Sequence, residues 1–135
     1  MLRSFIWLDK CLQANLEVQG WPAISRAESQ VMLLASAGIT RQIEISKALG
    51  LTRQAINQTM KLLKERRLID ILPDPEDRRC KVIAFAAEGA QMRADALKII
   101  ELMELELTDR IGRKTLQEMR DALDRNWGDI PIFDM

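Results

Sequence analysis

The chain has 135 residues, which is enough for one globular domain and too few for two. Hydrophobic residues make up 47% of the chain and charged residues 30%, as in ordinary globular proteins. Twenty basic residues balance twenty acidic ones, and no run of about 18 apolar residues could span a membrane. The chain contains no histidine, which excludes histidine-based acid–base catalysis, the Ser-His-Asp triad and most zinc sites. We therefore expect no enzymatic activity, no metal and no cofactor.

The first quarter of the chain has helical periodicity. Apolar residues at helical spacing predict a helix over residues 2–18, which ends before Pro22. Ser25 and Glu28 have the spacing of a capping box, so a second helix is expected to begin there. It is expected to stop at Gly38. The absence of a secretory signal in this region predicts a cytoplasmic protein.

Two short helices are predicted next, separated by only three residues. Thr40 is expected to cap the first of them, and Gly50 is expected to end it in a left-handed conformation. Thr52 is expected to cap the second, which covers about residues 52–67. Helices joined so closely must cross at a steep angle, as in a helix-turn-helix, whose second helix enters the major groove of DNA.

The pattern then changes from helical to extended. Two β-branched, apolar runs at 68–72 and 81–85, with a polar and proline-containing tip between them, predict a β hairpin. Beyond Gly89 the apolar spacing predicts a long helix that breaks at Gly112, and then a last amphipathic helix that reaches Trp127. The predicted fold class is mainly α, with a minor α+β part formed by the hairpin. The predicted architecture is a winged helix-turn-helix with a helical dimerisation lobe.

We place residues 1–135 in a single domain with two lobes. Residues 1–20 and 90–127 are expected to form the helical dimerisation lobe, because one winged domain cannot cover all their apolar stripes. Residues 25–88 are expected to form the DNA-binding lobe, with the recognition helix at about 52–67 and the wing at about 69–85. A two-fold dimer would place two recognition helices one DNA turn, ~34 Å, apart.

The predicted recognition helix has one face suited to reading bases. Ile56, Met60 and Leu63 are expected to point inward, and the opposite face carries amide and basic side chains. Asn and Gln can pair with adenine through two hydrogen bonds, and Arg or Lys can pair with guanine. Residues 41–67 contain seven basic and two acidic residues, a local net charge of +5. The plainer alternative is an ordinary solvated helix face.

The predicted wing adds basic side chains that could enter a minor groove or contact phosphate. Asp74, Glu76 and Asp77 lower the net charge of its tip. Over the whole chain, the residues predicted to bind DNA are Arg41, Thr52, Arg53, Gln54, Asn57, Gln58, Lys61, Lys64, Arg78, Arg79 and Lys81.

The middle of the chain resembles the core of the MarR (multiple antibiotic resistance regulator) family, in the segment ITRQIEISKALGLTRQAINQTMKLLKERRLIDILPDPEDRRCKVIAFAAEGA. The most specific part is LPDPEDRR between two strands, followed by FAAEG at the start of a long helix. The similarity covers about residues 25–123. It implies a homodimer, joined through its first and last two helices, that binds a pseudo-palindromic operator in double-stranded DNA, usually as a repressor. It also implies that Arg79 is the minor-groove residue and that Asp77 orients it.

The chain departs from the family pattern in three places. Ala86 stands where the family has a helix-capping threonine, and the first helix is shorter than in the family. Ala55 and Asn57 stand where the family often has Ser or Thr inside the recognition helix. The first two departures bear on local stability and on the dimer interface, and the third bears on which operator is read.

The resemblance also implies release by a small aromatic or phenolic effector, bound between the two lobes. The residues predicted to line this site are Trp7, Cys11, Trp21 and Met32, with Met92 beside them. An arginine such as Arg26 could pair a carboxylate of the ligand. The alternative is that these residues are ordinary core residues.

Two further alternatives concern the kind of signal and the kind of partner. Cys11 lies about where the hydroperoxide-sensing branch of the family keeps its reactive cysteine, although the tyrosines expected in that branch are missing here. Cys80 stands between Arg79 and Lys81, so its oxidation could disturb DNA contact. The chain could thus be a redox-responsive regulator through Cys11 or Cys80. It could also be a winged-helix protein-interaction module that does not bind DNA.

Overall fold

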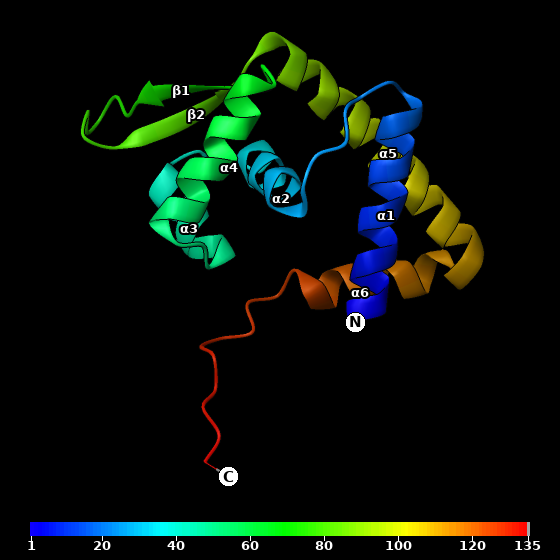
Figure 1. The fold of residues 1–135 in the computed structure, drawn as a ribbon. Helices are drawn as coiled ribbons and strands as arrows, with labels where there is room; N and C mark the ends of the chain where they lie inside the picture. The colour runs from blue at the N-terminus through cyan, green and yellow to red at the C-terminus, as the bar shows by residue number, and fades with distance from the viewer. Residues whose placement is uncertain (135) are drawn as a thin grey trace. The chain divides into compact units, whose positions relative to one another are not determined.

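The computed structural model describes residues 1–134, which form six helices and one two-stranded antiparallel sheet in the predicted order (Figure 1). The elements are α1 (Leu2–Val18), α2 (Arg26–Ser36), α3 (Gln42–Leu49), α4 (Arg53–Glu65), β1 (Ile69–Pro73), β2 (Lys81–Phe85), α5 (Ala87–Ile111) and α6 (Arg113–Leu123). The mainly α fold with a winged helix-turn-helix is therefore confirmed. None of these helices is both long enough and apolar enough to cross a membrane.

The chain divides into two compact units. The first unit, Met1–Ile100, contains α1 to α4, the hairpin and the first part of α5, and the second unit begins at Glu101. The boundary lies inside α5, so this helix contributes residues to both units. The dimerisation and DNA-binding lobes expected from the sequence stay a prediction.

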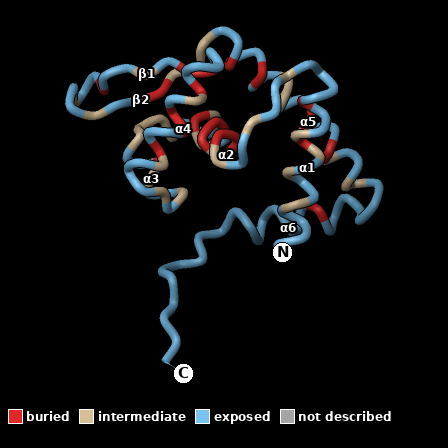
Figure 2. Tube along the Cα trace, viewed as in Figure 1, coloured by how far each residue is buried: buried red, intermediate tan, exposed pale blue. Residues whose placement is uncertain are grey.

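The apolar core of the first unit fixes the orientation of α4. Val31 from α2, Ile45 from α3 and Leu63 from α4 are 0% exposed, and Ile56 and Met60 of α4 are 2% and 1% exposed. Figure 2 shows buried residues gathered along α2 and the neighbouring turns of α4. Full burial of side chains of this size stabilises the fold by roughly 1.5–3 kcal/mol each. The inward face predicted for the recognition helix is confirmed.

Local sequence sets the ends of several helices. The Ser25 hydroxyl accepts a hydrogen bond from the Glu28 N–H at 3.2 Å, and the Glu28 carboxylate accepts one from the Ser25 N–H at 2.7 Å, which confirms the capping box. The Thr52 hydroxyl accepts from the Ala55 N–H at 3.1 Å, so Thr52 caps α4 as predicted. Gly50 ends α3 with φ 63°, in the left-handed region that favours glycine.

The predicted cap of α3 is wrong. Arg41, and not Thr40, occupies the N-cap position of this helix. The backbone carbonyl of Thr40 accepts a hydrogen bond from the Ile83 N–H at 2.9 Å, and Arg41 forms an isolated β-bridge with Val82. Pairing with β2 therefore draws the residues before α3 into an extended conformation, and this non-local contact overrides the local capping signal.

The long helix begins at Ala87, within the FAAEG segment, as the resemblance implied. Its first turn requires glycine at position 89, because a Cβ there would lie 1.8 Å from the carbonyl oxygen of Leu68. One other predicted boundary is wrong. The last helix ends at Leu123, and the Trp127 indole N–H donates to the carbonyl of Ala122 at 2.9 Å. Trp127 thus folds back onto the last turn of α6 instead of extending it.

Candidate nucleic-acid interface

The outer face of α4 presents polar and basic side chains, while its inner face is buried. All the side chains predicted to read bases or contact the backbone from this helix are exposed: Arg53, Gln54, Asn57, Gln58, Lys61 and Lys64. They project from a helix whose buried side is the core described above, so they are displayed on a rigid support. This exposure meets the geometric condition for contact with a base edge or a phosphate, and the contacts themselves stay a prediction.

A partly buried ion pair holds the C-terminal end of α4. The Arg66 guanidinium donates from Nε to the Glu28 carboxylate at 3.0 Å, and Glu28 is 1% exposed. Glu28 therefore both caps α2 and anchors the residue that ends α4. The sequence analysis predicted the capping role and missed the ion pair, because the two residues stand 38 positions apart and neither belongs to a local motif that would join them.

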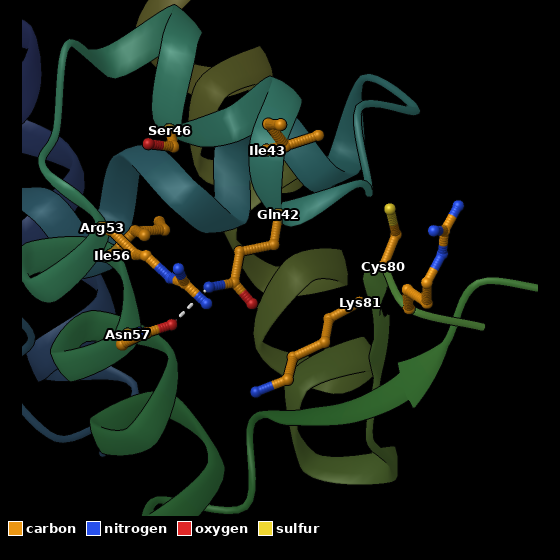
Figure 3. A pocket seen from close by; sticks show the side chains of 9 residues that line it. Gln42, Ile43, Ser46, Arg53, Ile56, Asn57, Cys80 and Lys81 are labelled. Carbon is orange, nitrogen blue, oxygen red and sulfur yellow. Dashed lines mark hydrogen bonds between the residues drawn. The ribbon is translucent and has the colours of Figure 1, made fainter. Parts of the chain in front are cut away.

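An open groove lies between α3, α4 and the wing, close to the predicted base-reading side chains (Figure 3). Its volume is about 390 Å³. Inside it, the Gln42 side-chain N–H donates to the Asn57 side-chain carbonyl, so α3 contacts the outer face of α4 directly. The residues that line the groove are Gln42, Ile43, Ser46, Arg53, Ile56, Asn57, Arg79, Cys80 and Lys81. Gln42 was not among the residues predicted from the sequence.

Arg41 links the start of α3 to the wing. Its Nε lies 2.7 Å from a carboxylate oxygen of Asp74, which is 3% exposed, and its terminal nitrogen donates to Glu76. The hydrogen bond with Glu76 and the charge of Asp74 raise the pKa of the Arg41 guanidinium. The guanidinium that the sequence analysis assigned to DNA binding is therefore paired within the protein, at the tip of the hairpin, and its contact with DNA stays a prediction.

The wing presents Arg79 together with Asp77. The hairpin pairs Ile69 with Phe85 at one end and Pro73 with Lys81 at the other, and its tip lies between these last two residues. The Asp77 carboxylate accepts hydrogen bonds from the Arg79 backbone N–H at 3.1 Å and from its Nε at 3.2 Å.

These hydrogen bonds from Arg79 lower the pKa of Asp77. The Arg79 side chain is 91% exposed. The structure thus shows the contact through which Asp77 could orient Arg79, and Arg78 and Lys81 are exposed beside it.

The environment of Cys80 differs from the basic one that its sequence neighbours suggested. Its thiol lies 3.6 Å from an Asp77 carboxylate oxygen. Burial, followed by the charge of Asp77, raises the pKa of the Cys80 thiol. A raised pKa leaves less thiolate at neutral pH, and the thiolate is the reactive form. The Asp77 carboxylate is thus a neighbour of the thiol that the sequence analysis did not predict.

Two of the methionines predicted at the effector site line a small cavity. Met32 and Met92 line an apolar cavity of about 30 Å³, far below the roughly 300–1,000 Å³ of small-molecule sites. Trp7, Cys11 and Trp21 are not among the residues that line it.

The three remaining candidates all lie in the first unit and make contacts of other kinds. The Trp21 indole donates to Asp95 at 2.8 Å, and the Cys11 sulfur accepts from the Asn15 amide at 3.6 Å. Trp7 is 37% exposed. Across residues 1–134, no group of three or more His, Cys, Asp or Glu side chains could hold a metal ion.

The element order and the exposed second helix of the α3–α4 pair define a winged helix-turn-helix protein. Residues 25–79 match the sequence model of the MarR family. No curated protein sequence matches the chain.

Several solved structures share the fold. A MarR-family transcriptional regulator from Rhodococcus sp. RHA1 is 25% identical, with TM-score 0.69 over 90% of this chain and 84% of that chain. The transcriptional repressor CouR, bound to a 23-mer DNA duplex, is 24% identical, with TM-score 0.69 over 91% and 88%. CouR from Rhodococcus jostii RHA1, bound to p-coumaroyl-CoA, is 26% identical, with TM-score 0.68 over 90% and 84%.

The resemblance to the MarR family is thus confirmed, in sequence over residues 25–79 and in fold over nine-tenths of the chain. Two of the solved structures that share the fold are described as transcriptional regulators, one of them of the MarR family.

Proposed function

We propose that this protein is a sequence-specific repressor that binds a pseudo-palindromic operator in double-stranded DNA as a homodimer in the cytoplasm. The observation that carries the proposal is the outer face of α4, where amide and basic side chains are exposed opposite a fully buried apolar face. The repressor CouR, which has the same fold, is bound to a DNA duplex in its structure. That relative supports DNA binding by this chain, and we propose that α4 enters the major groove.

The side chains divide by the contacts that their chemistry favours. Gln54, Asn57 and Gln58 can donate to and accept from base edges, whereas Lys64 is a charge suited to phosphate. Arg53 and Lys61 can serve either purpose, pairing with guanine or with phosphate. Because Arg79 is almost fully exposed on the wing, we propose that it enters the minor groove.

Exposed apolar side chains support the homodimer. Burial of apolar side chains stabilises an interface by roughly 25 cal/mol per Å² before the costs of association. On the helices predicted to form the interface, the exposed apolar residues are Leu2, Phe5, Leu8, Leu97, Leu102, Leu105, Ile111, Met119 and Leu123. We propose that a second copy of the chain covers them.

We propose that a small aromatic ligand releases the operator. The support is CouR, which is bound to p-coumaroyl-CoA in one of its structures. Trp7, Cys11, Trp21 and Met32 stay the predicted contacts of such a ligand. The alternative of redox control through Cys80 has less support, because the raised pKa of its thiol disfavours the reactive thiolate.

Fluorescence-anisotropy titration against the DNA just upstream of the protein's own gene tests the proposal. Random duplex serves as competitor, and the titration is repeated at several salt concentrations. We expect competitor-resistant binding of two subunits per site, with log K falling with log salt by about 0.9 for each phosphate contact. If selection from random duplexes also yields no preferred site, the proposed function is wrong and a protein-docking module is favoured.

A further inference from the structure

We propose that Gln42 is a specificity-determining positioning residue, which orients the Asn57 amide so that its NH₂ group, and not its carbonyl, faces the base. The inference rests on the proposed function, because it concerns how the outer face of α4 reads DNA. Gln42 lies at the first position of α3, outside the recognition helix, and its side chain crosses the groove to Asn57 (Figure 3).

The hydrogen bond between the two amides couples the orientation of the Asn57 amide to that of the Gln42 amide. An unconstrained asparagine can rotate by half a turn about its last side-chain bond, so it can offer either its NH₂ donor or its carbonyl acceptor to a base. Here the Gln42 N–H donates to the Asn57 carbonyl. That bond holds the Asn57 carbonyl toward α3 and leaves its NH₂ group directed away from Gln42.

The backbone is held in place next to both Gln42 and Asn57. Gln42 follows Arg41, which is bridged to Val82 and paired with the buried Asp74. Asn57 follows Ile56, which is 2% exposed. Because the backbone at both residues is held in this way, the two amides are paired in the free protein, and this pairing reduces the ordering cost of binding.

The turn between the two helices is fixed as well. The Ser46 hydroxyl donates to the Leu51 carbonyl at 2.8 Å, and Thr52 caps α4 immediately afterwards. The relative placement of α3 and the first turns of α4 is thus determined by hydrogen bonds as well as by apolar packing. Gln42 and Asn57 lie on the two helices that this turn joins.

The fixed orientation predicts a chemical preference. An outward NH₂ group matches base-edge acceptors in the major groove, namely N7 and O6 of guanine, N7 of adenine and O4 of thymine. It does not match the amino group of cytosine, which is a donor. At the base pair that Asn57 contacts, we therefore expect cytosine to be rejected, and we expect this rejection to depend on Gln42.

Selection of binding sites from random duplexes tests the inference with four proteins: wild type, Gln42→Met, Asn57→Ala and the double variant. Methionine has nearly the length of glutamine but no donor. We expect Gln42→Met to relax discrimination at the same base pair as Asn57→Ala, by about tenfold for one lost amide contact. In the double variant, Gln42→Met should cause no further loss. Gln54, another exposed amide on α4, serves as the control. When Gln42→Met is combined with Gln54→Ala, the losses of base discrimination caused by the two substitutions should multiply.

A second variant tests the polarity of the bond. Gln42→Glu keeps the side-chain length but offers only acceptors, so Asn57 must turn its NH₂ group inward and its carbonyl toward the base. We expect the preferred base to change to cytosine or adenine, whose amino groups donate. Relative base preferences are compared, because the added negative charge weakens binding to every sequence.

Three results would overturn the inference. The first is that Gln42→Met changes preference at a different base pair from Asn57→Ala, which would make Gln42 a direct reader. The second is that the two effects multiply in the double variant. The third is an unchanged preference in both Gln42 variants. Failure of the wild-type protein to select any site would instead reject the proposed function, and the inference with it.

Discussion

The recognition helix and the wing belong to the same surface, but different forces hold them. The helix α4 presents its polar face because Ile56, Met60 and Leu63 are buried on the other side. The hairpin buries Ile69 and Ile83 near its base, while its tip depends on charged groups. Arg41 pairs there with Asp74 and Glu76, and Asp77 pairs with Arg79.

This difference predicts different responses to solution conditions. Apolar burial depends little on salt and pH, whereas exposed ion pairs weaken with salt and with protonation of their carboxylates. We expect the recognition helix to keep its structure over a wide range of conditions. The tip of the wing should loosen first, and it should do so without global unfolding.

The largest effect is expected from a change under the recognition helix. Leu63→Ala removes a fully buried side chain and should reduce the free energy of unfolding by about 2–5 kcal/mol, at low and high salt alike. Urea unfolding followed by circular dichroism measures the loss. Lys64→Ala, on the exposed face of the same helix, is the matched control and should change stability by less than about 0.5 kcal/mol. Equal losses in the two variants would refute the assignment of faces.

A smaller and local effect is expected at the tip of the wing. Arg41→Met removes the guanidinium and leaves the Asp74 carboxylate buried without its counterion. Amide hydrogen exchange in residues 69–85 should become about tenfold faster, as for the loss of one charge-assisted hydrogen bond, while α4 keeps its protection. Lys47→Met, an exposed site on the same helix, is the control. Unchanged exchange in the wing would contradict the role given to Arg41.

A pH titration examines the tip. Arg79 lowers the pKa of Asp77, so this pair should stabilise the folded state at pH values above 3.8, the ordinary pKa of an aspartate. This stabilisation should be lost as the pH falls through the lowered pKa of Asp77. Carboxyl-carbon NMR should show a midpoint for Asp77 below 3.8 that rises in Arg79→Ala. A midpoint that does not respond to Arg79→Ala would show that the pair does not form in solution.

The smallest effect concerns the thiol beside this pair. In a Cys11→Ser background, Cys80 should react with iodoacetamide more slowly at pH 8 than it does in urea, because burial and Asp77 raise its pKa. Asp77→Asn should speed the reaction in the folded protein. A folded-state rate equal to the rate in urea would remove the argument against redox control through Cys80.

Features that depend on near neighbours in the chain could be predicted from the sequence. The capping box of Ser25 and Glu28, the left-handed Gly50 and the buried face of α4 are set within one or two helical turns. The order of helices and strands followed from the change of period near residue 68. The exposed face of the recognition helix followed in turn from its amphipathic pattern.

Features that depend on contacts between distant segments were missed. Thr40 has a good capping side chain, but pairing with Ile83 decides its conformation. The ion pairs of Arg41 were missed because its acidic partners lie more than thirty positions away, in the wing. The sequence neighbours of Cys80 are basic, while the carboxylate of Asp77 is folded back against its thiol. The pairing of Gln42 with Asn57 likewise appears only when α3 and α4 cross.

The most direct test of the central claim compares Asn57→Ala with Lys64→Ala on a selected operator and on random duplex. If α4 reads bases through its outer face, Asn57→Ala should weaken operator binding by about 1–3 kcal/mol and leave random-duplex binding unchanged. Lys64→Ala, as a phosphate contact, should weaken both by the same factor and reduce the salt slope by about one. Unchanged operator affinity and preference in Asn57→Ala would contradict the claim that this face of α4 reads the DNA.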